Sequence, residues 1–144
     1  MADLQWYNTV VDSRDALGQA RFWAAVLGWQ VRRDDPEWAT VGSPGGAPPY
    51  LAFTPVPEGK VVKNRLHLDL LPGQGISRQV ERRRLEGLGA TLVRTVVEDG
   101  VEAHDVMADP EGNEFCLLEP HPAYFAAPSA PHTPAPPTPA SSGP

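Results

Sequence analysis

The hydrophobic and polar positions of the chain alternate between the spacing of a helix and that of a strand. Between Asp15 and Gly28, apolar residues recur every three or four positions, which predicts a helix with Asp15 as its N-cap and Gly28 at its end. Short apolar runs bounded by Asp, Gly and Pro predict four strands around this helix, at residues 4–11, 29–33, 37–41 and 50–56. The first half is therefore predicted to run strand, helix and three strands.

The second half repeats this order. Ser77 can cap a helix that ends at Gly89. Four strands are predicted around it, at residues 65–71, 90–97, 102–107 and 114–118. The repeat predicts an α+β fold of two βαβββ modules, at about residues 3–58 and 63–120, each with one helix on one small sheet.

The last predicted strand follows directly from a tight turn, in the segment DPEGNEFCLL at residues 109–118. Its Asp, Pro, Gly and Asn residues are turn formers, and Phe115–Leu118 is too apolar to lie on a surface. A strand that is held by such a turn has a fixed register, so each of its side chains faces a defined side. The inward-facing positions of this strand are therefore candidate site positions.

Composition and charge exclude several classes of partner. The chain has 144 residues, enough for one domain with a core, and its net charge of -6 argues against nucleic-acid binding. No signal peptide and no apolar stretch of about 20 residues is visible, so no membrane partner is expected. A single cysteine suits a reducing compartment, and we expect a cytoplasmic protein.

The C-terminal residues differ in composition from the rest of the chain. Residues 126–144 are rich in Pro, Ala and Ser and show little apolar periodicity, which predicts a disordered tail. The folded unit is therefore expected to occupy residues 1–125.

Three segments, in this order, carry a resemblance to a known family: ARFWAAVLGW, KNRLHLDL and DPEGNEFCLL. Together with the repeated βαβββ order, they resemble the vicinal oxygen chelate superfamily, which includes glyoxalase I, bleomycin-resistance proteins and extradiol dioxygenases. The resemblance covers nearly all of residues 3–120 and is closest to the small bacterial glyoxalase-like proteins. It implies mixed sheets that curl around a cavity, which is often completed by formation of a homodimer.

In that superfamily, side chains on the first and last strands of each module hold a divalent metal. By this resemblance His67 occupies one ligand position, while Cys116 stands where a Glu is usual and Asn8 stands at the first-module position. Strand alternation places Asp69 on the same face as His67, and Glu114 on the same face as Cys116. These four residues form a conceivable set of metal ligands, but the set is expected to spread along two strands rather than to converge on one point. The residues therefore favour a protein without a bound cofactor, with Zn, Ni, Fe or Mn as the alternative.

His67 is the candidate catalytic residue, because a histidine can act as general acid or base near neutral pH. Asp69 or Cys116 can tune it; the alternative is a hydrogen-bonded histidine that lines a cavity without chemistry. Aromatic residues are numerous for so small a core, and an aromatic-lined cavity suits a flat or apolar ligand. The candidate ligand-binding residues are Trp6, Asn8, Trp38, Tyr50, Phe53, His67, His104 and Cys116.

Two function classes follow from these residues. The first is a metal-free protein that binds a small organic molecule, as bleomycin-resistance proteins do. The second is an enzyme, namely a lyase, isomerase or dioxygenase that uses a metal or His67. A partner-binding domain with a merely structural pocket is a third possibility. The poor set of metal ligands favours the first class.

Overall fold

The computed structural model describes residues 3–125 of the chain; the predicted tail at residues 126–144 lies outside the described residues. The first module contains β1 (Asn8–Ser13), α1 (Ala16–Leu27), β2 (Gln30–Arg33), β3 (Ala39–Gly42) and β4 (Tyr50–Pro55). Its four strands form the first sheet in the order β1-β4-β3-β2, in which β1 and β4 are parallel and the other pairs are antiparallel. The predicted order of strand, helix and three strands is confirmed.

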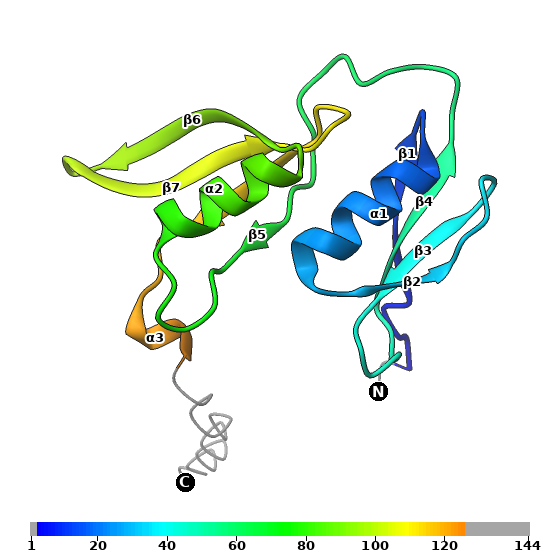
Figure 1. Ribbon diagram of the computed structural model, residues 1–144, viewed down its shortest axis with the longest axis horizontal. Coiled ribbons are helices and arrows are strands. Elements are labelled where there is room, and N and C mark those ends of the chain that lie inside the picture. The colour runs from blue at the N-terminus through cyan, green and yellow to red at the C-terminus, as the bar shows by residue number, and fades with distance from the viewer. Residues whose placement is uncertain (1–2, 126–144) are drawn as a thin grey trace, which may run out of the picture.

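The second module has the same order and the same topology (Figure 1). It contains β5 (Asp69–Leu70), α2 (Arg78–Leu88), β6 (Thr91–Glu98), β7 (Val101–Ala108) and β8 (Glu114–Leu118), and the short α3 (Pro122–Phe125) follows. The second sheet has the order β5-β8-β7-β6, with β5 and β8 parallel. The α+β class with two βαβββ modules is thus confirmed.

Both helices begin and end at the residues that the sequence indicates. The Asp15 carboxylate accepts a hydrogen bond from Gly18 N at 2.9 Å, and the Ser77 hydroxyl accepts one from Val80 N at 3.3 Å. Gly28 then ends α1 with a φ of 64°, a left-handed conformation that costs glycine little. Within the described residues, no helix is long and apolar enough to cross a membrane.

Two predicted strands are shorter than expected. The strand predicted from residue 4 begins only at Asn8, which pairs with Tyr50. The residues before Tyr50 are Pro48 and Pro49, which have no N–H group to extend the ladder. The strand predicted at residues 65–71 is reduced to β5, because this register places the turn before β8 opposite residues 65 and 66.

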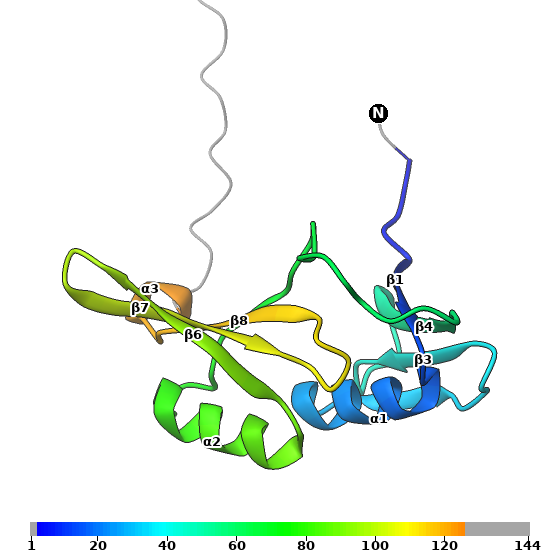
Figure 2. The same cartoon turned by 90° about the horizontal axis from the view of Figure 1, so that it is seen from above.

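The two modules share one core. Figure 2 shows α1 and α2 on the same side of the two sheets. Trp23 of α1 packs edge-on against Phe115 of β8, with 5.2 Å between the ring centroids. Arg84 of α2 donates to the carbonyl oxygens of Ala25 and Val26 at the end of α1, at 3.1 and 2.8 Å, where the helix dipole favours a cation.

Candidate functional site

A groove of about 690 Å³ lies between the two modules. One wall is β1, and the other is residues 58–68 of the segment that links β4 to β5. Side chains of the shared core, including Trp23, Leu51 and Leu68, also line it. We call this space the inter-module groove.

The mouth of the inter-module groove is apolar and open to solvent. Trp6 is 66% exposed, and Val61, Val62 and Leu66 of the linking segment are 93%, 76% and 83% exposed. Exposed apolar side chains that gather at one groove mark an interaction site more often than scattered ones do. This face of the molecule is therefore suited to contact an apolar partner or ligand.

One end of the groove continues into a more polar cavity of about 590 Å³. The two spaces share Asp12, Glu58 and Lys60. In the polar cavity, the Glu111 carboxylate accepts hydrogen bonds from Arg14 N at 2.7 Å and from Asp15 N at 2.9 Å. This carboxylate therefore connects the turn before β8 to the start of α1, where negative charge is favoured.

Glu114, at the start of β8, holds the linking segment in place. Its carboxylate accepts hydrogen bonds from Lys60 Nζ at 2.8 Å and from the backbone N–H of Asn64 at 3.0 Å. Burial raises the pKa of Glu114, but the hydrogen bonds from Lys60 and from backbone N–H groups outweigh it and lower the pKa to about 2. Glu114 is therefore ionised at neutral pH.

The contacts of Glu114 should make stability depend on pH. Because its pKa in the folded state lies below the ordinary value of 4.5, Glu114 contributes stability above pH 4.5, and that contribution is lost as the pH falls toward 2. We expect Glu114→Gln to lower the free energy of unfolding at pH 7 by up to about 3 kcal/mol. Denaturant titrations across this pH range measure the difference, which should shrink as the pH falls.

Glu58→Gln is the matched control for this prediction. Glu58 lies in the same linking segment and is exposed. It makes no hydrogen bond or ion pair among the described residues. Its variant should match the wild type in stability at every pH. A Glu114→Gln deficit that stays constant from pH 7 to acid would contradict the assignment.

Three of the four candidate metal ligands lie close together. The ligand atoms of His67, Asp69 and Cys116 all lie within 4.8 Å of one another, and His67 Nε2 is 3.3 Å from Asp69 Oδ1. The expectation that these donors are spread along two strands is wrong for these three, because β5 and β8 are parallel and pair Asp69 with Cys116. Glu114 is not part of the cluster, because Lys60 and Asn64 N occupy its carboxylate.

The Cys116 side chain is a protonated thiol at neutral pH. Burial raises its pKa, and the negative charge of Asp69 and a hydrogen bond with Asp69 raise it further. A raised pKa makes the thiol a weak nucleophile. The cluster can therefore bring the imidazole of His67 to the carboxylate of Asp69, and its thiol would have to lose a proton to solvent before the sulfur could bind a metal ion, but it is not an activated cysteine nucleophile.

The candidate ligand-binding residues do not all meet at one place. Trp6 and His67 line the inter-module groove. Phe53 is fully buried in the core, and Tyr50 packs against Tyr7 and donates to the carbonyl of Gly46 at 2.6 Å. The others that do not line the groove are Asn8 on β1, Trp38 before β3, His104 on β7 and Cys116 on β8.

The sequence patterns did not reveal the wall that the linking segment forms. Val61 and Val62 lie outside every predicted helix and strand, and Leu66 was predicted only as part of the strand at residues 65–71. The signal that was available is their apolar character beside Lys60 and Lys63, because such residues seldom lie together in an ordinary polar loop.

Residues 8–118 match the family model described as glyoxalase-like domain. No curated protein sequence gives a significant match. Similar solved structures include a glyoxalase/bleomycin resistance protein/dioxygenase family enzyme from Burkholderia phytofirmans, with 19% identity and a TM-score of 0.58 over 79% of this chain and 97% of that chain. A glyoxalase-related enzyme from Fulvimarina pelagi has 18% identity and a TM-score of 0.57 over 79% of this chain and 86% of that chain.

The fosfomycin resistance protein FosX from Mesorhizobium loti has a similar fold. It shares 12% identity with a TM-score of 0.60, over 88% of this chain and 100% of that chain. Because the sequence identities are this low, the comparisons with these structures show a shared fold alone. The implied fold of paired βαβββ modules is therefore shared with solved proteins that carry quite different names.

Proposed function

Because the chain belongs to the family of glyoxalase-like domains, we propose that it binds a small aromatic or apolar organic molecule in the inter-module groove. The observation that carries this proposal is the groove itself. Its volume of about 690 Å³ is within the range of small-molecule sites, and apolar side chains line it together with charged and polar ones such as Lys63, Arg65 and His67. A cytoplasmic location is part of the proposal and is supported by the single buried cysteine.

The names of the similar structures support a small organic ligand without identifying it. They include a fosfomycin resistance protein and a family enzyme named for glyoxalase, bleomycin resistance and dioxygenase. A shared fold carries many activities, so the ligand must be argued from this chain's own residues. Those residues are the apolar mouth around Trp6 and the polar group of His67.

The residues at the expected metal-ligand positions favour binding without a metal. Asn8 gives the first module no strong metal donor at its expected position, and Glu114 is already bound to Lys60. The three remaining donors include a thiol whose pKa is raised. A metal would have to displace this proton and find further ligands.

A homodimer is part of the same proposal. Trp6, Val61 and Leu66 of the groove lining are large apolar side chains, each more than half exposed, as are Leu4 and Tyr7, which adjoin Trp6 in the chain. A second copy that covers this surface would remove them from water and close the groove. Analytical ultracentrifugation of the full chain tests this; a monomer at micromolar concentration would contradict it.

Replacement of Trp6 by alanine is expected to weaken binding of a neutral aromatic probe such as 2-naphthol by about 10-fold or more, because an exposed indole at the groove mouth supplies much of the contact area. Isothermal titration calorimetry measures the change. Tyr7→Ala is the control, since Tyr7 is a neighbouring exposed aromatic residue that does not line the groove. Equal losses in both variants, or no binding of any aromatic probe to the wild type, would remove the basis of the proposal.

A second candidate function rests on the His67–Asp69–Cys116 cluster. Imidazole, carboxylate and thiol within 4.8 Å of one another form a donor set that suits Zn²⁺ and similar ions. With a metal, or with His67 as acid or base oriented by Asp69, the chain would be a lyase, isomerase or dioxygenase. A rise in melting temperature on addition of Zn²⁺, Ni²⁺, Fe²⁺ or Mn²⁺ that His67→Ala abolishes would favour this function; no change would favour metal-free binding.

A further inference from the structure

The second sheet carries a row of side chains on the face opposite α2. Its register pairs Arg94 with Val106, Val106 with Cys116, and Cys116 with Asp69. Directly paired residues project from the same face, and Asp105 and Met107, the neighbours of Val106, project toward the helix side. Arg94 is two strand spacings from Cys116, about 10 Å, a gap that an extended arginine side chain largely bridges.

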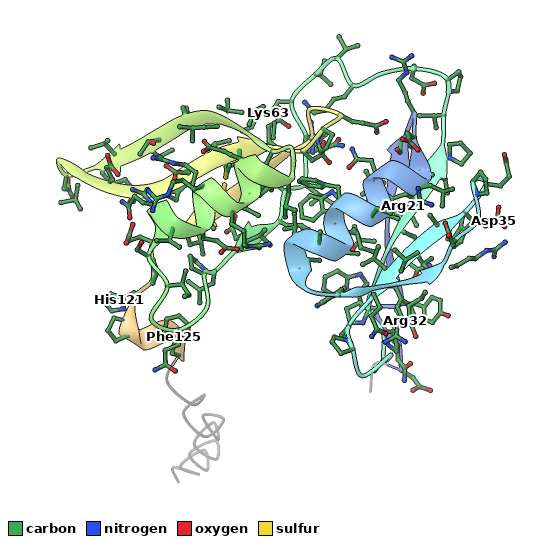
Figure 3. All side chains as sticks on the ribbon, viewed as in Figure 1. Arg21, Arg32, Asp35, Lys63, His121 and Phe125 are labelled. Atoms are coloured by element: carbon green, nitrogen blue, oxygen red, sulfur yellow. The ribbon has the colours of Figure 1, made fainter. Side chains whose placement is uncertain are left out.

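Lys63 approaches the same place from the linking segment. It lines the inter-module groove together with His67, and Figure 3 places it where that segment returns toward the second sheet. The positive charges of Arg94 and Lys63 both act on the Cys116 thiol and oppose the rise of its pKa. Lys63 therefore reaches this face from the lining of the groove, and Arg94, which does not itself line the groove, reaches it along the second sheet.

Both cations are unpaired within the part of the chain that the structure describes. Among the described residues, neither Lys63 nor Arg94 makes a hydrogen bond or an ion pair, whereas the nearby carboxylates are engaged. Glu114 is bound by Lys60 and Asn64 N, and Asp69 contacts His67 and Cys116. This positive character stands out in a chain whose net charge is -6.

The other end of the inter-module groove has the opposite charge. There the groove joins the polar cavity, and Asp12, Glu58 and Lys60 line the shared part. Asp15 and Glu111 lie further inside that cavity beside Arg14, so its acidic side chains outnumber its basic ones. A ligand with one charged group would therefore bind in one orientation, with an acidic group directed away from this end.

We propose that Lys63, Arg94 and His67 bind the carboxylate of the ligand, so that the molecule held in the inter-module groove is a small organic acid with an aromatic or apolar body. This inference rests on the proposed function, because the groove must hold the apolar part. Lysine and arginine donate charge-assisted hydrogen bonds to a carboxylate, and His67 can donate a further one. Asp69, at 3.3 Å, orients the imidazole of His67.

The test compares 2-naphthoate with its neutral amide, 2-naphthamide, by calorimetric titration of the full chain. We expect the acid to bind about 10-fold more tightly than the amide, the gain expected of a charge-assisted hydrogen bond. Lys63→Gln and Arg94→Gln should each reduce this preference, because each weakens binding of the acid more than binding of the amide. Arg83→Gln, an exposed cation of α2, is the control and should keep the full preference.

The outcomes separate the two proposals. Equal binding of acid and amide, or a preference that survives Lys63→Gln and Arg94→Gln, would overturn the carboxylate site and leave the groove as an apolar binding site. Failure of both probes to bind would overturn the proposed function and this inference with it. A preference that falls with added salt and disappears in the Lys63→Gln, Arg94→Gln double variant would support both.

Discussion

Replacement of Trp23 by alanine is expected to lower the free energy of unfolding by about 3–5 kcal/mol, the range for removal of a large aromatic side chain from a core. Trp23 is 4% exposed and packs edge-on against Phe22 and Phe115, at 5.6 and 5.2 Å between ring centroids. Its Nε1 also donates to Asp109 Oδ2 at 3.2 Å, so the variant loses a buried hydrogen bond as well. Chemical denaturation followed by circular dichroism measures the loss.

Trp6→Ala is the matched control, because Trp6 is also a tryptophan but is 66% exposed. Its stability should stay within about 0.5 kcal/mol of the wild type, as is usual for surface substitutions. Since Trp23 connects α1 to β8, its loss should weaken both modules in one transition. A loss below about 1 kcal/mol, or two separate transitions, would show that the modules do not depend on this contact.

Arg78→Ala is the second large effect that we expect, with a loss of about 3–5 kcal/mol, because it removes the fully buried one of the two cations that pair with a buried carboxylate. Arg78 of α2 is 1% exposed and forms ion pairs with Glu102, with Glu119 at 3.0 Å and with Asp105 at 3.4 Å. Asp105 is fully buried. Its remaining partners would be the hydroxyl of Thr95 and the half-buried Arg82, whose Nη1 lies 3.5 Å from Asp105 Oδ2.

Two further variants make this prediction specific. Arg83→Ala on the same helix should leave stability nearly unchanged, because Arg83 is exposed. Arg78→Met combined with Asp105→Leu should be more stable than Arg78→Ala, because it removes the buried charge together with its partner. If the double variant were the least stable of the set, uncompensated charge would not be the reason for the loss.

The helices and the order of the elements were predictable because their signals are local. Asp15 and Ser77 cap the helices through their own first turns, and Gly28 and Gly89 end them in the left-handed region. These effects involve residues a few positions apart, so the sequence displays them directly. The turn at residues 109–113 is equally local, because Asp109 accepts hydrogen bonds from the backbone N–H groups of Glu111 and Asn113.

The site was predictable only in part, because its geometry depends on pairing between distant segments. The parallel pairing of β5 and β8 brings Asp69 to Cys116, and spacing along the chain does not indicate which residues become neighbours. In the same way, the sequence predicts that Phe53 lines a cavity, but its strand directs the side chain into the core under α1. The wall of the groove depends on Glu114, which binds a segment about 50 residues earlier in the chain.

The candidate metal ligand Glu114 lines the inter-module groove, and of the candidate ligand-binding residues Trp6 and His67 reach it. Both lie beside strand ends, on stretches that extend beyond the ladder of β1 or β5. Side chains at such positions stay accessible. The candidate ligand-binding residues within β4, β7 and β8, namely Tyr50, Phe53, His104 and Cys116, do not line the groove.

The central claim is that the inter-module groove binds an organic molecule and needs no metal to do so. The most direct measurement is a two-dimensional NMR titration of the metal-depleted, isotope-labelled chain with 2-naphthol and 2-naphthoate. Our account predicts saturable shifts of the backbone amides of Thr9, Val10 and residues 61–68, the two walls of the groove. Shifts confined to other surfaces, or shifts of these amides only after a divalent metal is added, would contradict it.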